Sequence, residues 1–330
     1  MERIALGASG RHTTRLGFGC SNLMGAMGRG DSLRLLEAAY GAGIRHFDVA
    51  PMYGYGEAES CLSQFLKHHR DQVTITTKYG IPPAKNSVLI RAGRRLAAPV
   101  IKQIPSLKKR IAKTVNAVVR NDERPTFTAV QAKASLDRSL ANLGTDRIDL
   151  WLLHEVTAHN LQDDNLLRLL EDLVQQGTIG TFGIGSNADK IPALLAERAA
   201  YCRTLQYEWS IFASPIPDSP ILTSKPFRIH HRALTDNFRG LHAALVKDKL
   251  RCQRWSSSTN ADLSDEETLA KLMLKAALAM NPSSIVLFSS KNPRHIQANV
   301  NTASDVTLDQ PARQLYTLVQ SERDQLVNIT

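Results

Sequence analysis

Residues 43–59 read GIRHFDVAPMYGYGEAE, in which a short β-like run, His46–Asp48, ends on an acidic residue and passes into a glycine-rich loop. Short runs of this kind alternate with helical patterns along the chain. Strands that alternate with helices in one chain form parallel sheets, with the helices as crossover connections. The predicted strands are Arg15–Gly19, His46–Asp48, Val73–Thr77, Ile148–Leu153, Thr181–Ile184, Thr204–Glu208, Phe227–His231 and Ser284–Phe288.

Helical patterns lie between these runs. Asp31 is predicted to cap a helix that runs to Ala42, because apolar residues then recur at helical spacing. Ser264, with Glu267 three residues later, predicts a capping box at the start of another helix. The helix with this capping box is predicted over Asp265–Met280, and further helices are predicted over Thr128–Gly144, Asp164–Gln176, Asp189–Glu197 and Pro311–Val327.

Two architectures suit eight alternating strands, a closed barrel and an open doubly wound sheet. An open sheet that binds a dinucleotide needs three glycines in fixed spacing after its first strand. Gly17-Phe-Gly19 and Gly54-Tyr-Gly56 lack the third glycine, and Gly183-Ile-Gly185 is followed by Ser-Asn-Ala. We therefore predict an α/β protein, a (β/α)8 TIM barrel that forms a single domain over residues 1–330.

Three segments exceed what a minimal barrel needs. They are an insertion over residues 81–125 and irregular stretches over residues 213–225 and 237–261. Each follows a predicted strand, and the loops after barrel strands emerge at the face where the active sites of such barrels lie. All three are therefore expected to crowd the mouth of the barrel.

The positive charge of the chain is concentrated in the insertion. Residues 85–124 hold eleven Lys and Arg against Asp122 and Glu123, which accounts for nine of the net ten positive charges. The segment is interpreted as a solvated helical insertion, as an attraction for an anionic substrate, or as a peripheral contact with an anionic membrane. Nucleic acid is the least favoured partner, because the segment lacks aromatic residues on which bases could stack.

The rest of the composition indicates a cytoplasmic protein. The N-terminal residues carry charges where a signal peptide has its apolar core, and no stretch approaches the roughly 18 apolar residues of a membrane span. Cys20, Cys61, Cys202 and Cys252 show no paired spacing. They are expected to be reduced thiols rather than disulfides or ligands of a metal.

Ionisable residues stand where consecutive strands stop. Asp48, Lys78 and His154 end the second, third and fourth strands, and Tyr53 follows Asp48 in its loop. A tyrosine has a pKa of roughly 10, and a nearby ammonium lowers that pKa, while a carboxylate keeps the ammonium charged. A histidine can orient a substrate oxygen. Together these four residues predict proton transfer to or from a carbonyl oxygen.

Several stretches taken together resemble the aldo-keto reductase family. Residues 43–59 resemble its first signature, and the other stretches match its N-terminal hairpin, first strand and later strand ends. Only residues 81–125 fall outside this resemblance. The other stretches are Leu6-Gly7-Ala8-Ser9-Gly10, Arg15-Leu16-Gly17-Phe18-Gly19, Thr77-Lys78-Tyr79-Gly80, Ile148-Asp149-Leu150-Trp151-Leu152-Leu153-His154 and Gly183-Ile184-Gly185-Ser186-Asn187.

The resemblance implies a catalytic tetrad of Asp48, Tyr53, Lys78 and His154, with Tyr53 as the general acid in reduction. It implies NAD(P)(H)-dependent hydride transfer that interconverts a carbonyl and an alcohol on a small organic molecule. Anionic molecules are among the possible substrates. Tyr55 is a rival phenol, which the spacing of the family disfavours. The alternative function is a cofactor-binding regulatory or scaffold subunit on the same barrel.

The same resemblance places the cofactor. Ser186 and Asn187 match residues that hold the nicotinamide carboxamide, although they could also cap the next helix. Gln206 matches a further carboxamide contact. His231 stands where the family has an aromatic residue that stacks on the nicotinamide.

After the eighth strand the family binds the adenosine phosphate. The lysine of the family falls on Ser289 and its arginine on His295 in this chain, but neighbouring cations could still reach a 2′-phosphate. NADPH is therefore the favoured cofactor, with NADH as the alternative. The residues assigned to this end of the cofactor are Ser290, Lys291, Arg294 and Asn299.

Overall fold

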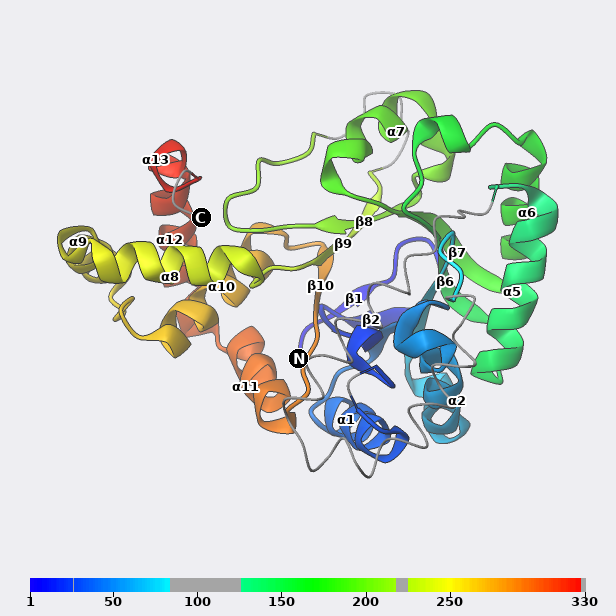
Figure 1. The fold of residues 1–330 in the computed structure, drawn as a ribbon, viewed down its shortest axis with the longest axis horizontal. Helices are drawn as coiled ribbons and strands as arrows, with labels where there is room; N and C mark the ends of the chain where they lie inside the picture. Colours follow the sequence, from blue (N-terminus) through cyan, green and yellow to red (C-terminus); the bar gives the residue numbers. More distant parts are fainter. Residues whose placement is uncertain (26, 84–125, 218–224, 328–330) are drawn as a thin grey trace, which may run out of the picture.

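The computed structural model describes residues 1–25, 27–83, 126–217 and 225–327. A closed barrel of eight parallel strands stands at the centre, in the order β10-β3-β4-β5-β6-β7-β8-β9 (Figure 1). The predicted barrel is confirmed, and each strand lies within a few residues of its predicted bounds. The strands are β3 (Leu16–Gly19), β4 (His46–Asp48), β5 (Thr74–Tyr79), β6 (Ile148–His154), β7 (Ile179–Gly185), β8 (Thr204–Glu208), β9 (Phe227–His231) and β10 (Ser284–Phe288).

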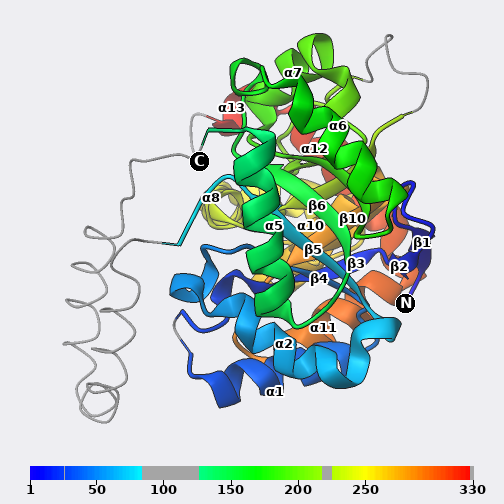
Figure 2. The same ribbon diagram turned by 90° about the vertical axis from the view of Figure 1, so that its right-hand side faces the viewer.

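Helices surround the barrel, and α2, α5 and α6 stand side by side on one flank of it (Figure 2). The helix α5 begins after Thr128, whose side chain accepts a hydrogen bond from the Gln131 amide, and ends at the left-handed Gly144, as predicted. The helices are α1 (Arg29–Gly41), α2 (Ala58–His69), α5 (Ala129–Leu143), α6 (Asp164–Gln175), α7 (Ile191–Glu197), α8 (Asp236–Lys247), α9 (Lys249–Thr259), α10 (Glu266–Met280), α11 (Pro293–Ser304), α12 (Asp309–Ser321) and α13 (Arg323–Val327).

The predicted N-terminal caps of two helices are wrong. The helix α1 begins at Arg29, before Asp31, and Gly28 is its N-terminal cap. The helix α10 is capped by Asp265, whose carboxylate accepts the Thr268 amide at 2.8 Å. Ser264 does not form a capping box, because its hydroxyl donates to the Asp262 carboxylate at 2.6 Å instead.

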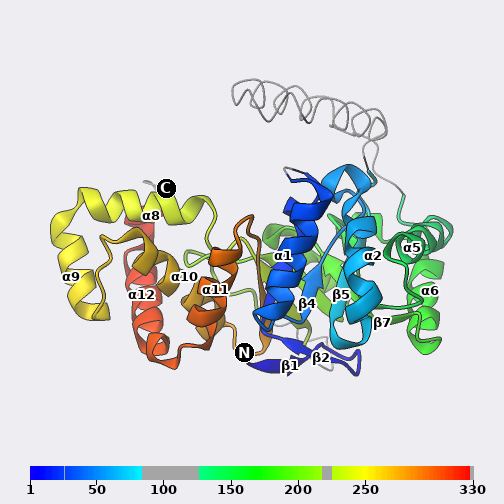
Figure 3. The same ribbon diagram turned by 90° about the horizontal axis from the view of Figure 1, so that it is seen from below.

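The stretch 237–261, expected to be irregular and to crowd the mouth, forms the helices α8 and α9. Cys252, Trp255 and Thr259 are buried at a spacing of three and four residues, which is a helical period that the prediction missed. The two helices pack against α10 and α12 and extend to one side of the barrel (Figures 1 and 3). The basic cluster over residues 85–124 and most of the stretch 213–225 lie outside the described residues.

The alternation of side chains along each strand divides the core in two. Residues such as Trp151 and Leu153 point outward and pack under the helices. Leu150 and Leu152 point inward and form a smaller interior cluster, which Leu6 joins from the hairpin of β1 (Arg3–Ala5) and β2 (His12–Thr14). One face of every strand thus belongs to the barrel interior, where a cavity can open.

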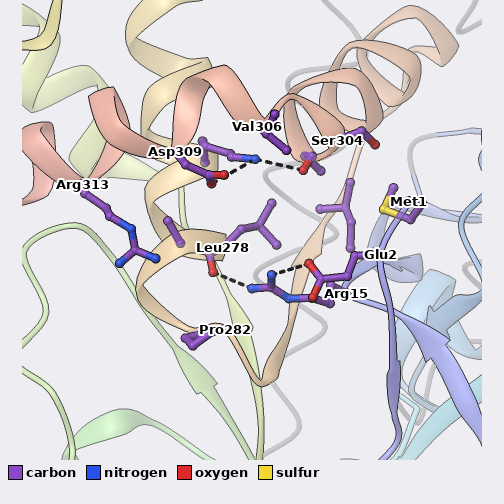
Figure 4. A pocket seen from close by; sticks show the side chains of 13 residues that line it. Met1, Glu2, Arg15, Leu278, Pro282, Ser304, Val306, Asp309 and Arg313 are labelled. Atoms are coloured by element: carbon purple, nitrogen blue, oxygen red, sulfur yellow. Dashed lines mark hydrogen bonds and ion pairs between the residues drawn. The ribbon is translucent and has the colours of Figure 1, made fainter.

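A cavity of about 400 Å³ lies beside the start of β3, where the N-terminal segment meets α10, α11 and α12 (Figure 4). Its charged groups are largely paired with each other. Arg15 contacts the Glu2 carboxylate at 2.7 Å, and Lys275 contacts Asp309 at 3.3 Å. In such barrels the active-site residues lie at the opposite end of the strands. We therefore interpret this cavity as structural.

The close approach of β7 and β8 gives a test of the barrel geometry. A Cβ atom on Gly183 would lie 2.0 Å from the Thr204 carbonyl oxygen, so Gly183→Ala must displace one of the strands. We expect a loss of about 3 kcal/mol or more in the free energy of unfolding, measured by urea denaturation. As a control, Gly41→Ala places its methyl group in open space and should change stability by about 1 kcal/mol or less. Equal stability of the two variants would contradict this packing.

Candidate active site

The inward face of the strands brings together the side chains predicted to do chemistry. Asp48, His154 and His231 end β4, β6 and β9, and Lys78 and Gln206 stand near the ends of β5 and β8. Because the strands are parallel, all five residues meet at the carboxyl end of the barrel. They line a cavity of about 640 Å³, to which Tyr53, Ser186 and Asn299 also contribute.

A buried ion pair forms the floor of this cavity. Lys78 Nζ lies 2.6 Å from Asp48 Oδ1 and also donates to the Val49 carbonyl at 3.1 Å. The other carboxylate oxygen, Asp48 Oδ2, accepts a hydrogen bond from Gln206 Nε2 at 2.9 Å. Both charged side chains are less than 5% exposed, so each charge depends on its partners for stabilisation.

The ammonium of Lys78 keeps its charge in spite of burial. Burial lowers the pKa of Lys78, but the carboxylate of Asp48 and the phenol of Tyr53 outweigh this effect and raise the pKa above its usual value. Lys78 is therefore a fixed positive charge beneath the cavity at every physiological pH.

Tyr53 is held beside this charge by an unusual loop. Its backbone amide donates to the Ala50 carbonyl at 3.0 Å, and the next residue, Gly54, has a left-handed backbone with φ of 59°. A Cβ atom on Gly54 would lie 2.5 Å from the Leu23 carbonyl oxygen, so only glycine fits there. The centre of the Tyr53 ring lies 5.6 Å from Lys78 Nζ.

The expected lowering of the Tyr53 pKa is not the net result. Lys78 lowers the pKa of Tyr53, as predicted, but burial and the Asp48 carboxylate raise it, and the balance lies above 10. Asp48 neutralises much of the effect of Lys78 because the two charges are in contact. Tyr53 is consequently a protonated phenol near neutral pH, which suits a proton donor.

The cavity also holds polar groups that could bind a ligand. Gln206 is 4% exposed, and its Oε1 atom is buried without a hydrogen-bond partner. The Ser186 hydroxyl donates to the Val156 carbonyl at 2.9 Å, which leaves its oxygen able to accept. Burial, Arg232 and Lys78 lower the pKa of His231 to about 4, so its imidazole is neutral.

Four predicted cofactor residues do not line the cavity. Asn187 precedes the short helix η5 (Ala188–Lys190) and makes no side-chain cap. Ser290 bonds to the backbone of Asn292, where α11 begins, and Lys291 and Arg294 are exposed near the same point. These last three residues can meet a ligand only if it extends from the cavity towards the start of α11.

The prediction missed other residues that line the cavity. Glu155 and Arg232 each directly follow a strand-ending histidine, and Ser21 and Ser289 face one another across the ends of β3 and β10. The sequence signal for these residues was their position immediately after a strand end. In a continued strand, however, the alternation of side chains would place such a residue outside the barrel.

Comparison with known proteins identifies the family. The family model for the aldo/keto reductase family matches residues 15–224. The chain belongs to this family, as its resemblance indicated.

Individual relatives agree with this assignment. The chain is 33% identical over 190 residues to a D-threo-aldose 1-dehydrogenase of a Pseudomonas species, which is 55% of this chain and 53% of the relative. It is 32% identical over 201 residues to a pyridoxal 4-dehydrogenase of Microbacterium luteolum, 56% of each protein. The chain thus matches only about half the length of these curated relatives.

A solved structure shows the same fold. The holo form of an aldo-keto reductase from Bacillus halodurans superimposes with a TM-score of 0.65 at 19% identity, over 96% of both chains. Within the part of this chain that the structure describes, no helix could cross a membrane. The described residues also contain no group of His, Cys, Asp or Glu side chains arranged for a metal ion, and all four cysteines are buried free thiols.

The buried histidines predict an acid-sensitive fold. Burial lowers the pKa of His46 and His230 to about 3 and that of His231 to about 4. The unfolded chain binds these protons near pH 6.5, so the free energy of unfolding must fall as the pH drops from 6.5 towards 4. Each histidine contributes about 1.4 kcal/mol per pH unit within that window.

His230 gives the sharpest test, because neither of its ring nitrogens has a hydrogen-bond partner. We expect His230→Phe to recover about 2 kcal/mol of this loss at pH 4.5, measured by urea denaturation at several pH values. The exposed His68 serves as a control, and His68→Phe should leave the pH dependence as it is. A parallel pH dependence of the His230 variant and the original protein would refute the prediction.

Proposed function

We propose that this protein interconverts a carbonyl and an alcohol by NAD(P)(H)-dependent hydride transfer, with Tyr53 as the general acid and base. The observation that carries the proposal is the position of the Tyr53 ring, whose centre lies 5.6 Å from Lys78 Nζ of the buried Lys78–Asp48 pair in the cavity. The relatives named above, an aldose dehydrogenase and a pyridoxal dehydrogenase, act in keeping with such chemistry.

The residues of the cavity fit a nicotinamide. The unpartnered Gln206 Oε1 can accept a hydrogen bond from a carboxamide NH2 group, and the Ser186 oxygen offers a second acceptor. The neutral imidazole of His231 can stack on an aromatic ring without repelling a positive charge. Asn187 and Asn299 are assigned to the same cofactor. When bound, the cofactor supplies or accepts a hydride at the substrate carbon.

The protein residues then handle the proton. In reduction, the carbonyl oxygen gains the electron pair of its π bond as hydride reaches the carbon, and Tyr53 donates its phenolic proton to that oxygen. The Lys78 ammonium stabilises the phenolate that remains, and Asp48 holds Lys78 in place. His154, at the end of β6, orients the substrate oxygen by a hydrogen bond. In oxidation the proton moves in the opposite direction.

Tyr53→Phe tests the proton transfer. The variant keeps the ring but loses the acidic hydroxyl, so we expect kcat for generic aldehydes to fall by about 10²- to 10⁴-fold. Fluorescence titration should show cofactor binding unchanged within about threefold, because other residues are assigned to that task.

Tyr55→Phe is the matched control, since it removes the rival phenol of the same loop and should retain most of the rate. A Tyr53→Phe enzyme with the original rate would exclude this mechanism. If the original protein bound cofactor but turned over no aldehyde or alcohol, the regulatory or scaffold function would be favoured.

The choice of cofactor can be tested at the start of α11. We propose that Lys291 and Arg294, both exposed there, contact the 2′-phosphate that distinguishes NADPH from NADH, beside Ser290. The double variant Lys291→Ala, Arg294→Ala should weaken NADPH binding by about tenfold or more and leave NADH binding nearly unchanged. Fluorescence titration with both nucleotides measures this. Equal weakening of both would show that these side chains do not read the 2′-phosphate.

A further inference from the structure

Gln206 is a third member of the buried cluster formed by Lys78 and Asp48. It stands on the inward face of β8, is 4% exposed, and donates from Nε2 to Asp48 Oδ2 at 2.9 Å. An ionised carboxylate can only accept hydrogen bonds, so the amide nitrogen must face Asp48 and the amide oxygen must face away from it. This hydrogen bond therefore fixes the orientation of the whole amide.

Each oxygen of the Asp48 carboxylate has its own donor. Oδ1 accepts from Lys78 Nζ at 2.6 Å and Oδ2 accepts from Gln206, while Asp48 is 3% exposed, so water has little access to either oxygen. Among the residues that the structure describes, no second donor is bonded to Oδ2. Without the Gln206 amide, the charge on Oδ2 would be balanced by Lys78 alone.

Tyr53 lies where the charge of Asp48 has an effect. Lys78 lowers the pKa of Tyr53, whereas burial and Asp48 raise it, so the phenol responds to the balance between two charges in contact. A neutral N–H donor on Oδ2 disperses part of the carboxylate charge and so favours Lys78 in this balance. The further groups that act on the Tyr53 pKa are Cys20, directly after β3, and Arg232, and the other titratable groups that line the cavity are His154, Glu155 and His231.

We propose that Gln206 is a positioning residue for proton transfer, whose hydrogen bond fixes Asp48 against Lys78 and thereby sets how firmly Tyr53 holds its proton. This role rests on the proposed function and is additional to the contact with the cofactor. The Gln206 Oε1 atom is buried without a hydrogen-bond partner, and a Cβ atom on Gly185 would lie 3.3 Å from it, so the glycine leaves Oε1 open. One amide thus serves the cofactor through its oxygen and the proton donor through its nitrogen.

Gln206→Met tests this role, because methionine has a similar length but no N–H donor. The phenol can be followed without cofactor or substrate by introducing 3-fluorotyrosine at position 53 and recording its fluorine NMR shift against pH. We expect the pKa of this phenol to be about 0.5 to 1 unit higher in Gln206→Met than in the protein that keeps Gln206. Gln206→Asn, whose amide is too short to reach Asp48, should give the same shift and guards against a folding defect in the first variant.

Ser186→Ala is the matched control. Ser186 is assigned to the same cofactor, but its hydroxyl donates to the Val156 carbonyl and does not contact Asp48. Both Ser186→Ala and Gln206→Met should weaken cofactor binding by about threefold or more, whereas only Gln206→Met should move the pKa. Alcohol oxidation needs the phenolate as a base, so the rise of kcat with pH should move to higher pH in Gln206→Met and stay in place in Ser186→Ala. Thermal melting confirms that each variant is folded.

The outcomes distinguish this role from the proposed function. An unchanged pKa in both Gln206 variants, or an equal shift in Ser186→Ala, would overturn the positioning role and leave hydride transfer as proposed. If the original protein turned over no aldehyde or alcohol, the proposed function would fail, and the positioning role with it, even where the pKa of the phenol had shifted.

Discussion

The ion pair between Lys78 and Asp48 is the interaction on which the site depends. Two charges buried at the end of a barrel are costly to desolvate, and removing one partner of such a pair typically costs about 3–5 kcal/mol. The pair is stabilised by further hydrogen bonds, from Lys78 to the Val49 carbonyl and from Gln206 to Asp48. It thereby ties β4, β5 and β8 together and fixes a positive charge beside Tyr53.

The barrel makes this arrangement possible because it gives all eight strands a common interior. Period-two alternation sends Leu150 and Leu152 into the apolar interior and His154, on the same face, into the cavity. The same face of β4 carries His46, buried deep in the barrel, and Asp48 near the mouth. The inward-facing side chains thus form the packed interior of the barrel and, nearer its mouth, the candidate active site. Gly183, two residues before Gly185 in β7, is constrained by the close approach of the Thr204 carbonyl oxygen.

Much of this could be predicted from local pattern. The strands, the helix that starts after Thr128 and the strand-end residues Asp48, Lys78 and His154 follow from periodicity and from residue types at run ends. The helices α8 and α9 were missed although their buried residues recur at helical spacing, Leu241 and Leu245 in α8 and Cys252 and Trp255 in α9. The cap of α10 was misplaced by one residue because Asp262 competes for the Ser264 hydroxyl.

The barrel, the family and the residues that could carry the chemistry follow from local sequence, because they depend on periodicity and on motifs within short segments. How those residues act on each other depends instead on contacts between distant parts of the folded chain. Gln206 contacts Asp48 across 158 positions of chain, and Asp48 and burial together reverse the effect of Lys78 on the Tyr53 pKa. Glu155 and Arg232, each with a left-handed backbone directly after a strand end, also line the cavity. These effects depend on distances and burial, which local sequence does not specify.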